Sequence, residues 1–200
     1  MDTKLEISDF LSKFFATTAR QRIQKMIRVM KLTVEPVQST KDDQILGDNI
    51  SIIMLWSSIG AIFLKIHFNL EVAKKLAAGS LEKSTDEISR EMALDFMKEC
   101  NNGVGGFVRG LFESNDMLMG MSLPFLAEGK DELIFRKIRD PRSMGYEWKI
   151  LLEDGDSFQL TLEICILETT NILSKIDKLE ASMIDGDIED DSDGEVEFLF

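Results

Sequence analysis

The residues best suited to chemistry lie in the stretch DFMKECNNGVGGFVRG, residues 95–110. It combines a carboxylate, Glu99, with a carboxamide, Asn102, and then places glycines where a helix normally disfavours them. Each glycine costs a helix interior roughly 0.8–1.0 kcal/mol relative to alanine. A carboxylate can bind a cationic side chain, and a carboxamide can hold a water molecule through its carbonyl oxygen or amide protons. Whether these groups act together depends on whether the helix stops at Asn102 or continues.

Helical periodicity predicts that the helix continues through the glycines to about residue 112. At about 100° per residue, one apolar stripe runs unbroken along it, formed by Ala93, Cys100, Val104, Phe107 and Leu111. On another face Glu99, Asn102 and Gly106 fall within about 60° of one another. The missing side chain at Gly106 would let another molecule come close. Asp95 and Arg109, on the same helix, are further candidates for partner binding.

These residues also have a purely structural interpretation. Glu99 and Asn102 would then be ordinary solvated side chains, and Gly106 would permit close internal packing. Cys100 is a poor candidate for a nucleophile, because it lies on the apolar stripe and has no histidine nearby in the sequence. His67, the single histidine of the chain, is expected to be structural, and no metal site is expected.

The composition is that of an ordinary globular protein, with 44% hydrophobic and 30% charged residues over 200 positions. The formal net charge of −13 disfavours nucleic acid and anionic membranes as partners, because both are bound through clustered lysine and arginine. Cys100 and Cys165 lack the spacing of a metal site or redox pair, so we expect two reduced, buried thiols in a cytoplasmic protein. The polar first ten residues do not resemble a signal peptide. The apolar run 50–68 is interrupted too often for a membrane span.

The C-terminal residues 185–200 hold eight carboxylates and no base, and we expect them to be a disordered tail. Because the tail ends in apolar residues, Phe198 and Phe200 are candidates for binding a partner and tethering it. The alternative is a tail that only solubilises the protein. Residues 169–184 have the apolar spacing of a separate helix.

The first half of the chain predicts a helix, strands and a second helix. Residues 5–30 have helical spacing with Ser8 as a cap, and 32–38 read as an edge strand because Pro36 cannot donate to a ladder. Two apolar segments, 50–56 and 61–68, predict a hairpin. A short helix then begins after Asn69 and ends at Gly79.

The second half predicts the motif-bearing helix, opened by Ser84 or Asp86, followed by strands. The four expected strands are 117–129, 131–138, 146–155 and 157–168. Clustered strands with intervening helices indicate an α+β fold, with a mainly antiparallel sheet packed in two layers against long helices. The expected domain spans residues 1–168.

Glu99-x-x-Asn102-x-x-x-Gly106 resembles the E-x-x-N-x-x-x-G signature of the CheC/CheX/FliY family of chemotaxis phosphatases. The order of elements around the motif is also similar to that family over roughly residues 5–168. The N-terminal helix contains no second E-x-x-N, so the chain resembles the single-motif CheX members more than the two-motif CheC members.

The resemblance implies hydrolysis of the aspartyl phosphate on a CheY-type response regulator in chemotaxis or two-component signalling. Asn102 matches the family position that orients the attacking water, and Glu99 matches the position that engages the regulator's lysine. The resemblance implies no cofactor on this chain, and a magnesium ion on the regulator. It also implies a homodimer formed by sheet pairing, for which 32–38 or strands within 131–152 offer edges. The alternative is a non-catalytic binding module for a regulator or flagellar component.

Overall fold

The computed structural model describes residues 3–27, 31–37, 46–58, 60–138 and 143–166. Its centre is a seven-stranded antiparallel sheet in the order β1-β6-β7-β3-β2-β4, with β5 also paired to β2. The strands are β1 Leu32–Pro36, β2 Asn49–Ser57, β3 Gly60–Phe68, β4 Gly120–Met121, β5 Phe125–Glu128, β6 Met144–Leu152 and β7 Ser157–Ile166. The predicted α+β class with an antiparallel sheet is confirmed.

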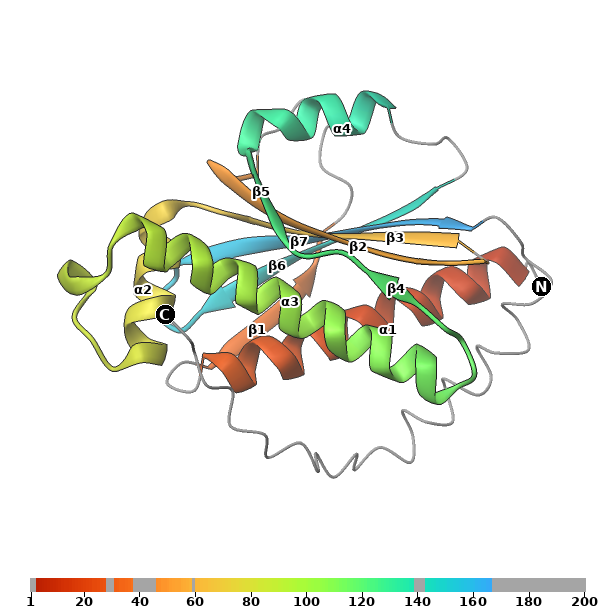
Figure 1. Cartoon of the computed structure of the whole chain (residues 1–200), viewed down its shortest axis with the longest axis horizontal. Helices are drawn as coiled ribbons and strands as arrows, with labels where there is room; N and C mark the ends of the chain where they lie inside the picture. Colours follow the sequence, from red (N-terminus) through yellow and green to blue (C-terminus); the bar gives the residue numbers. More distant parts are fainter. Residues whose placement is uncertain (1–2, 28–30, 38–45, 59, 139–142, 167–200) are drawn as a thin grey trace.

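Three helices lie together against one face of the sheet, and a fourth lies over the other face (Figure 1). The first three are α1 Thr3–Met26, α2 Leu70–Leu81 and α3 Arg90–Ser114, and the fourth is α4 Glu132–Ile138. Alternate residues of β2 and β3 point at the first three helices and form the core with them, including the fully buried Ile53, Leu55, Leu64 and Ile66. The period of two along each strand makes this face mostly apolar, with Ser51 of β2 as a buried polar residue on it.

The predicted strands are confirmed in the N-terminal half and at the end of the domain. β2 and β3 form the expected hairpin, and β6 and β7 form another. β1 pairs only with β6 and is an edge of the sheet. Pro36 is tolerated there because an edge strand does not need a backbone donor on its open side. The expectation that 131–152 offers a free strand edge is wrong, because β6 lies inside the sheet between β1 and β7.

Residues 131–138 were predicted as a strand, and this is wrong. A short 3-10 turn at Gly129–Asp131 leads into α4, and the buried Glu132 of this helix pairs with Lys65 of β3 at 2.9 Å. Gly129 is needed here because a Cβ atom would overlap the carbonyl of Gly47. Of the predicted strand 117–129, only β4 and β5 form.

Several predicted helix boundaries also differ from the structure. α1 begins at Thr3, so Ser8 lies within it and does not cap it. α2 continues through Gly79 to Leu81, and Glu82 ends it in the left-handed conformation. Ser80 supports the continuation because its hydroxyl donates to the Met26 carbonyl at 2.9 Å. The predicted helix at 169–184 and the tail at 185–200 lie outside the described residues.

Candidate functional site

The signature helix α3 runs without interruption from Arg90 to Ser114. Ser89 begins it, and its hydroxyl accepts a hydrogen bond from the Met92 amide at 3.2 Å. The predicted openings at Ser84 and Asp86 are therefore wrong for α3; Ser84 instead caps a preceding 3-10 turn. The predicted continuation past Asn102 is confirmed, so the carboxylate, the carboxamide and the glycines all belong to one rigid element.

The glycines of α3 occupy three different environments. A Cβ atom at Gly103 would lie 3.1 Å from the sulfur of Met26 on α1, and one at Gly105 would lie 3.2 Å from Ile53 on β2. Both glycines therefore allow close internal packing. At Gly106 and Gly110 a Cβ atom would meet nothing within 4 Å. Internal packing does not explain Gly106, which leaves a bare patch on the surface of the helix.

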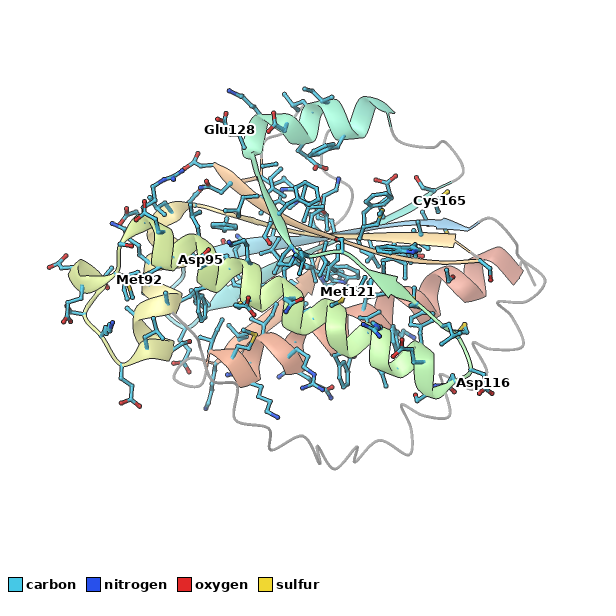
Figure 2. All side chains as sticks on the ribbon, viewed as in Figure 1. Met92, Asp95, Asp116, Met121, Glu128 and Cys165 are labelled. Atoms are coloured by element: carbon cyan, nitrogen blue, oxygen red, sulfur yellow. The ribbon has the colours of Figure 1, made fainter. Side chains whose placement is uncertain are left out.

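Glu99 is exposed and Asn102 is half-buried, and they lie one turn apart on the same helix face as Gly106. Within the described ranges, neither side chain has a hydrogen-bond or ion-pair partner. Figure 2 shows the side chains along α3, with Asp95 on its N-terminal half and Met121 of β4 beside it. The Glu99 carboxylate and the Asn102 carboxamide can therefore bind an incoming molecule without first breaking a hydrogen bond or ion pair within the described part of the chain.

Asp95 and Arg109 are exposed on α3 as predicted, but each is already paired within the helix. Asp95 forms an ion pair with Lys98, and Arg109 pairs with Glu113 at 2.9 Å. Exposed pairs of this kind contribute at most about 1 kcal/mol. Both residues can therefore exchange these partners for groups on another protein at little cost.

Asn101, the neighbour of Asn102, is fully buried and ties α3 to the sheet. Its side-chain amide donates to the Ser51 carbonyl at 2.9 Å and lies 3.2 Å from the Ser51 hydroxyl and 3.4 Å from the Leu64 carbonyl. The prediction that Asn101 points away from the Glu99 face is confirmed. Its anchoring role was missed, because a lone asparagine in an apolar stripe does not reveal which strand carbonyls lie opposite it.

Cys100 is buried, and this burial, with a smaller contribution from the charge of Glu99, raises the pKa of its thiol. A thiol that stays protonated at neutral pH is a poor nucleophile, which agrees with the sequence interpretation. Cys165 is half-buried, so the prediction that both cysteines are buried is wrong for this one. His67 is buried, and its Nε2 lies 2.8 Å from the Thr161 hydroxyl.

Different elements flank the two sides of the exposed α3 face. On one side, Arg22 of α1 stacks over the Phe107 ring, 3.8 Å from its centroid. On the other, the segment containing β4 and β5 carries most of the exposed large apolar side chains in the described part of the chain. These are Leu118, Leu123, Phe125 and Leu126, with Trp56 beside them on β2; Ile134 is also exposed but lies on α4.

Solved structures of other proteins share this architecture, although their sequences differ from this one. No protein-family sequence model matches the chain, and no curated protein sequence matches it. CheX from Vibrio vulnificus is 18% identical, with a TM-score of 0.57 over 79% of this chain and 99% of that one. The matched chain of a CheX–CheY–BeF3–Mg complex from Borrelia burgdorferi is 18% identical, with a TM-score of 0.57 over 76% and 96%. FliY from Thermotoga maritima is 11% identical, with a TM-score of 0.55 over 91% and 99%.

This chain has the CheC/CheX/FliY fold. The matches cover nearly the whole of each solved chain, so the likeness extends to the complete domain and is not confined to one motif. In this CheC/CheX/FliY fold the Glu99-x-x-Asn102-x-x-x-Gly106 sequence occupies the exposed face of α3. The predicted tail contacts Phe198 and Phe200 lie outside the described residues. Among the helices described, none is long and apolar enough to cross a membrane.

Proposed function

We propose that this chain is a CheX-like phosphatase that hydrolyses the aspartyl phosphate of a CheY-type response regulator. The observation that carries the proposal is the pairing of Glu99 and Asn102 on one exposed helix face beside Gly106, where a Cβ atom would meet nothing within 4 Å. Its fold is that of chemotaxis proteins, one of them solved in complex with CheY. If Glu99, Asn102 and Gly106 had only a structural role, close packing would have to explain the glycine, but nothing packs against Gly106.

The chemistry asks little of this chain beyond positioning. An aspartyl phosphate is a reactive acyl phosphate, so water needs only to be held in line with the bond that breaks. Asn102 orients that water through its carboxamide. The water oxygen bonds to phosphorus, the bond from phosphorus to the aspartyl oxygen breaks, and the products are the free carboxylate and inorganic phosphate.

Glu99 contributes to binding the regulator and to aligning the two proteins. Its carboxylate pairs with the lysine of the regulator and so fixes where Asn102 lies relative to phosphorus. Magnesium, held by the regulator, offsets the charge on the phosphoryl oxygens. No covalent intermediate on this chain is required, which is consistent with the buried, protonated Cys100.

A second candidate function is a non-catalytic module that binds a regulator or a flagellar component. It is favoured by the similarity of the fold to FliY and to the FliM middle domain, each 11% identical to this chain. The two candidates differ in their demands on the α3 face, because binding alone does not require a carboxamide aimed at water.

A phosphate-release assay separates the two functions. A CheY-type regulator is phosphorylated, and its loss of phosphate is followed with and without this protein, in parallel with binding to the same regulator. Acceleration that is lost in Glu99→Ala and Asn102→Ala supports the phosphatase. Tight binding with unchanged decay would support the module, and no binding to any CheY-type regulator would contradict the phosphatase.

Gly106→Ala is expected to stabilise the protein while impairing its function. Alanine is preferred to glycine in a helix by up to about 1 kcal/mol, and nothing in the structure opposes the added methyl group. The unfolding midpoint should rise by about 2–4 °C, as measured by thermal circular dichroism. The same methyl group occupies the patch against which the regulator packs, so phosphatase activity should fall.

Gly110→Ala is the matched control, because a Cβ atom there also meets nothing within 4 Å. Gly110 lies two turns from Asn102, so it should gain the same stability and keep full activity. Equal activities in the two alanine variants would contradict a functional role for the bare patch.

We also propose that the protein is cytoplasmic and forms a homodimer. The argument for a dimer is that β1 is an open edge whose backbone groups can pair with a second copy. Sedimentation of the full chain tests it, and a monomer at all concentrations would contradict it.

A further inference from the structure

The charge along α1 is opposite in sign to the charge of the whole protein. Residues 12–31 contain six basic residues and no acidic one, although the chain as a whole has a formal net charge of −13. In the described part of this stretch, Lys13, Arg20, Lys25 and Lys31 are exposed and Arg22 is half-buried, and all of these except Lys31 belong to α1. A run of one sign on a protein of the other sign creates a local field that an oppositely charged molecule can follow.

Part of this charge lies beside the α3 site. α1 and α3 pack antiparallel, with Met26 against Gly103, Arg22 over Phe107 and Phe14 against Phe112. Phe107 directly follows Gly106, so the Arg22 guanidinium borders the bare patch. Lys25 lies about 60° from Arg22 on the helix wheel of α1. It follows Arg22 by about one helical turn and directly precedes Met26.

The other two bases of this stretch that belong to α1, Lys13 and Arg20, lie on its other flank. Lys13 and Arg20 fall about 20° apart on the helix wheel, on the same face of α1 as Gln24. The Gln24 side chain accepts a hydrogen bond from the Leu32 amide of β1 at 2.9 Å. The helix therefore carries two pairs of like charge, one bordering the candidate site and the other directed away from it.

We propose that Arg22 and Lys25 form an electrostatic docking site for the negatively charged surface around the acyl phosphate of the partner. This inference rests on the proposed function and adds a contact that the signature motif does not contain. An acyl phosphate is anionic, and oxygen-rich carboxylate groups hold its magnesium ion. When α3 approaches that group, the neighbouring α1 bases face the surrounding carboxylates, whereas the acidic remainder of this chain repels them.

Stacking gives Arg22 a defined position for this task. A guanidinium held over an aromatic ring loses less side-chain freedom when it binds an anion than a mobile lysine does. Charges at the rim of an interface mainly raise the association rate, and their effect weakens as salt is added. Arg22 and Lys25 are accordingly docking residues, and the hydrolytic step is left to Asn102.

The test measures association of the full-length protein with a CheY-type regulator loaded with magnesium and beryllofluoride. Stopped-flow rates are compared at ~50 mM and ~500 mM salt. The variant Arg22→Gln/Lys25→Gln is expected to associate about three- to tenfold more slowly at low salt, with the difference shrinking at high salt. The matched variant Lys13→Gln/Arg20→Gln changes the net charge equally and should stay within about twofold of wild type. Arg22→Lys keeps the charge without the planar stack and should retain most of the rate.

The outcomes separate this inference from the proposed function. Equal rates for the two double variants, with hydrolysis intact, would overturn the docking site alone. A faster rate for Arg22→Gln/Lys25→Gln would mean that an acidic segment of this chain competes for the two bases, and would also overturn it. Failure of the wild-type protein to bind or dephosphorylate the regulator would contradict the proposed function itself. Thermal unfolding of each variant verifies that the Arg22 stack is not needed for folding.

Discussion

Asn102→Ala is expected to reduce the acceleration of phosphate loss from a CheY-type regulator by about 100-fold. The substitution removes the group that holds the attacking water, and misplacing a reacting group by one ångström is enough for a loss of this size. Asn102 has no side-chain partner among the described residues, so its removal should leave the fold intact. Single-turnover phosphate release, with this protein in excess over the phosphorylated regulator, measures the chemical step directly.

Binding provides the internal control for this variant. The affinity of Asn102→Ala for the regulator loaded with magnesium and beryllofluoride should match that of wild type, because Glu99 still pairs with the regulator's lysine. Glu99→Gln should behave differently and lose affinity as well as rate, since it removes a charge-assisted contact. If Asn102→Ala hydrolysed at the wild-type rate, Asn102 would not be the water-positioning residue and the adaptor function would gain support.

The course of α3 was predictable because its apolar stripe repeats at the helical period for more than three turns. That repeat specified which face Glu99 and Asn102 share, and the structure places both on the surface. The roles of the glycines were less predictable. Gly105 and Gly106 are adjacent and chemically identical, yet one packs against Ile53 and the other faces open space. Only the position of the sheet distinguishes them.

The sequence interpretation of α4 failed for a different reason. Residues 131–138 are few, and a short apolar run such as 133–135 fits a strand as well as a buried helix. Tertiary contacts determine that this segment is a helix. Glu132 is buried against Lys65, and the Lys65 ammonium also lies 5.2 Å from the centroid of the Phe135 ring. A buried carboxylate needs such a partner, and its partner is 67 residues away in the sequence.

Asn101→Ala is expected to have the reverse effect of Asn102→Ala, lowering the free energy of unfolding by about 2–4 kcal/mol. The side chain is fully buried, and its amide bonds to the Ser51 carbonyl of β2. Alanine would remove these bonds and leave a cavity between α3 and the sheet. Denaturant unfolding measures the loss, and Asn102→Ala in the same experiment should change stability by less than about 1 kcal/mol.

The two asparagines thus test the site and the fold separately with one identical substitution. They differ by about 100° around the same helix, and that rotation sends one carboxamide to the strand carbonyls and the other to the surface. Because the Asn101 contacts reach both β2 and β3, they also fix the rotation of α3 that presents Glu99 and Asn102. If Asn101→Ala proved neutral in stability, packing of the apolar stripe alone would set that rotation.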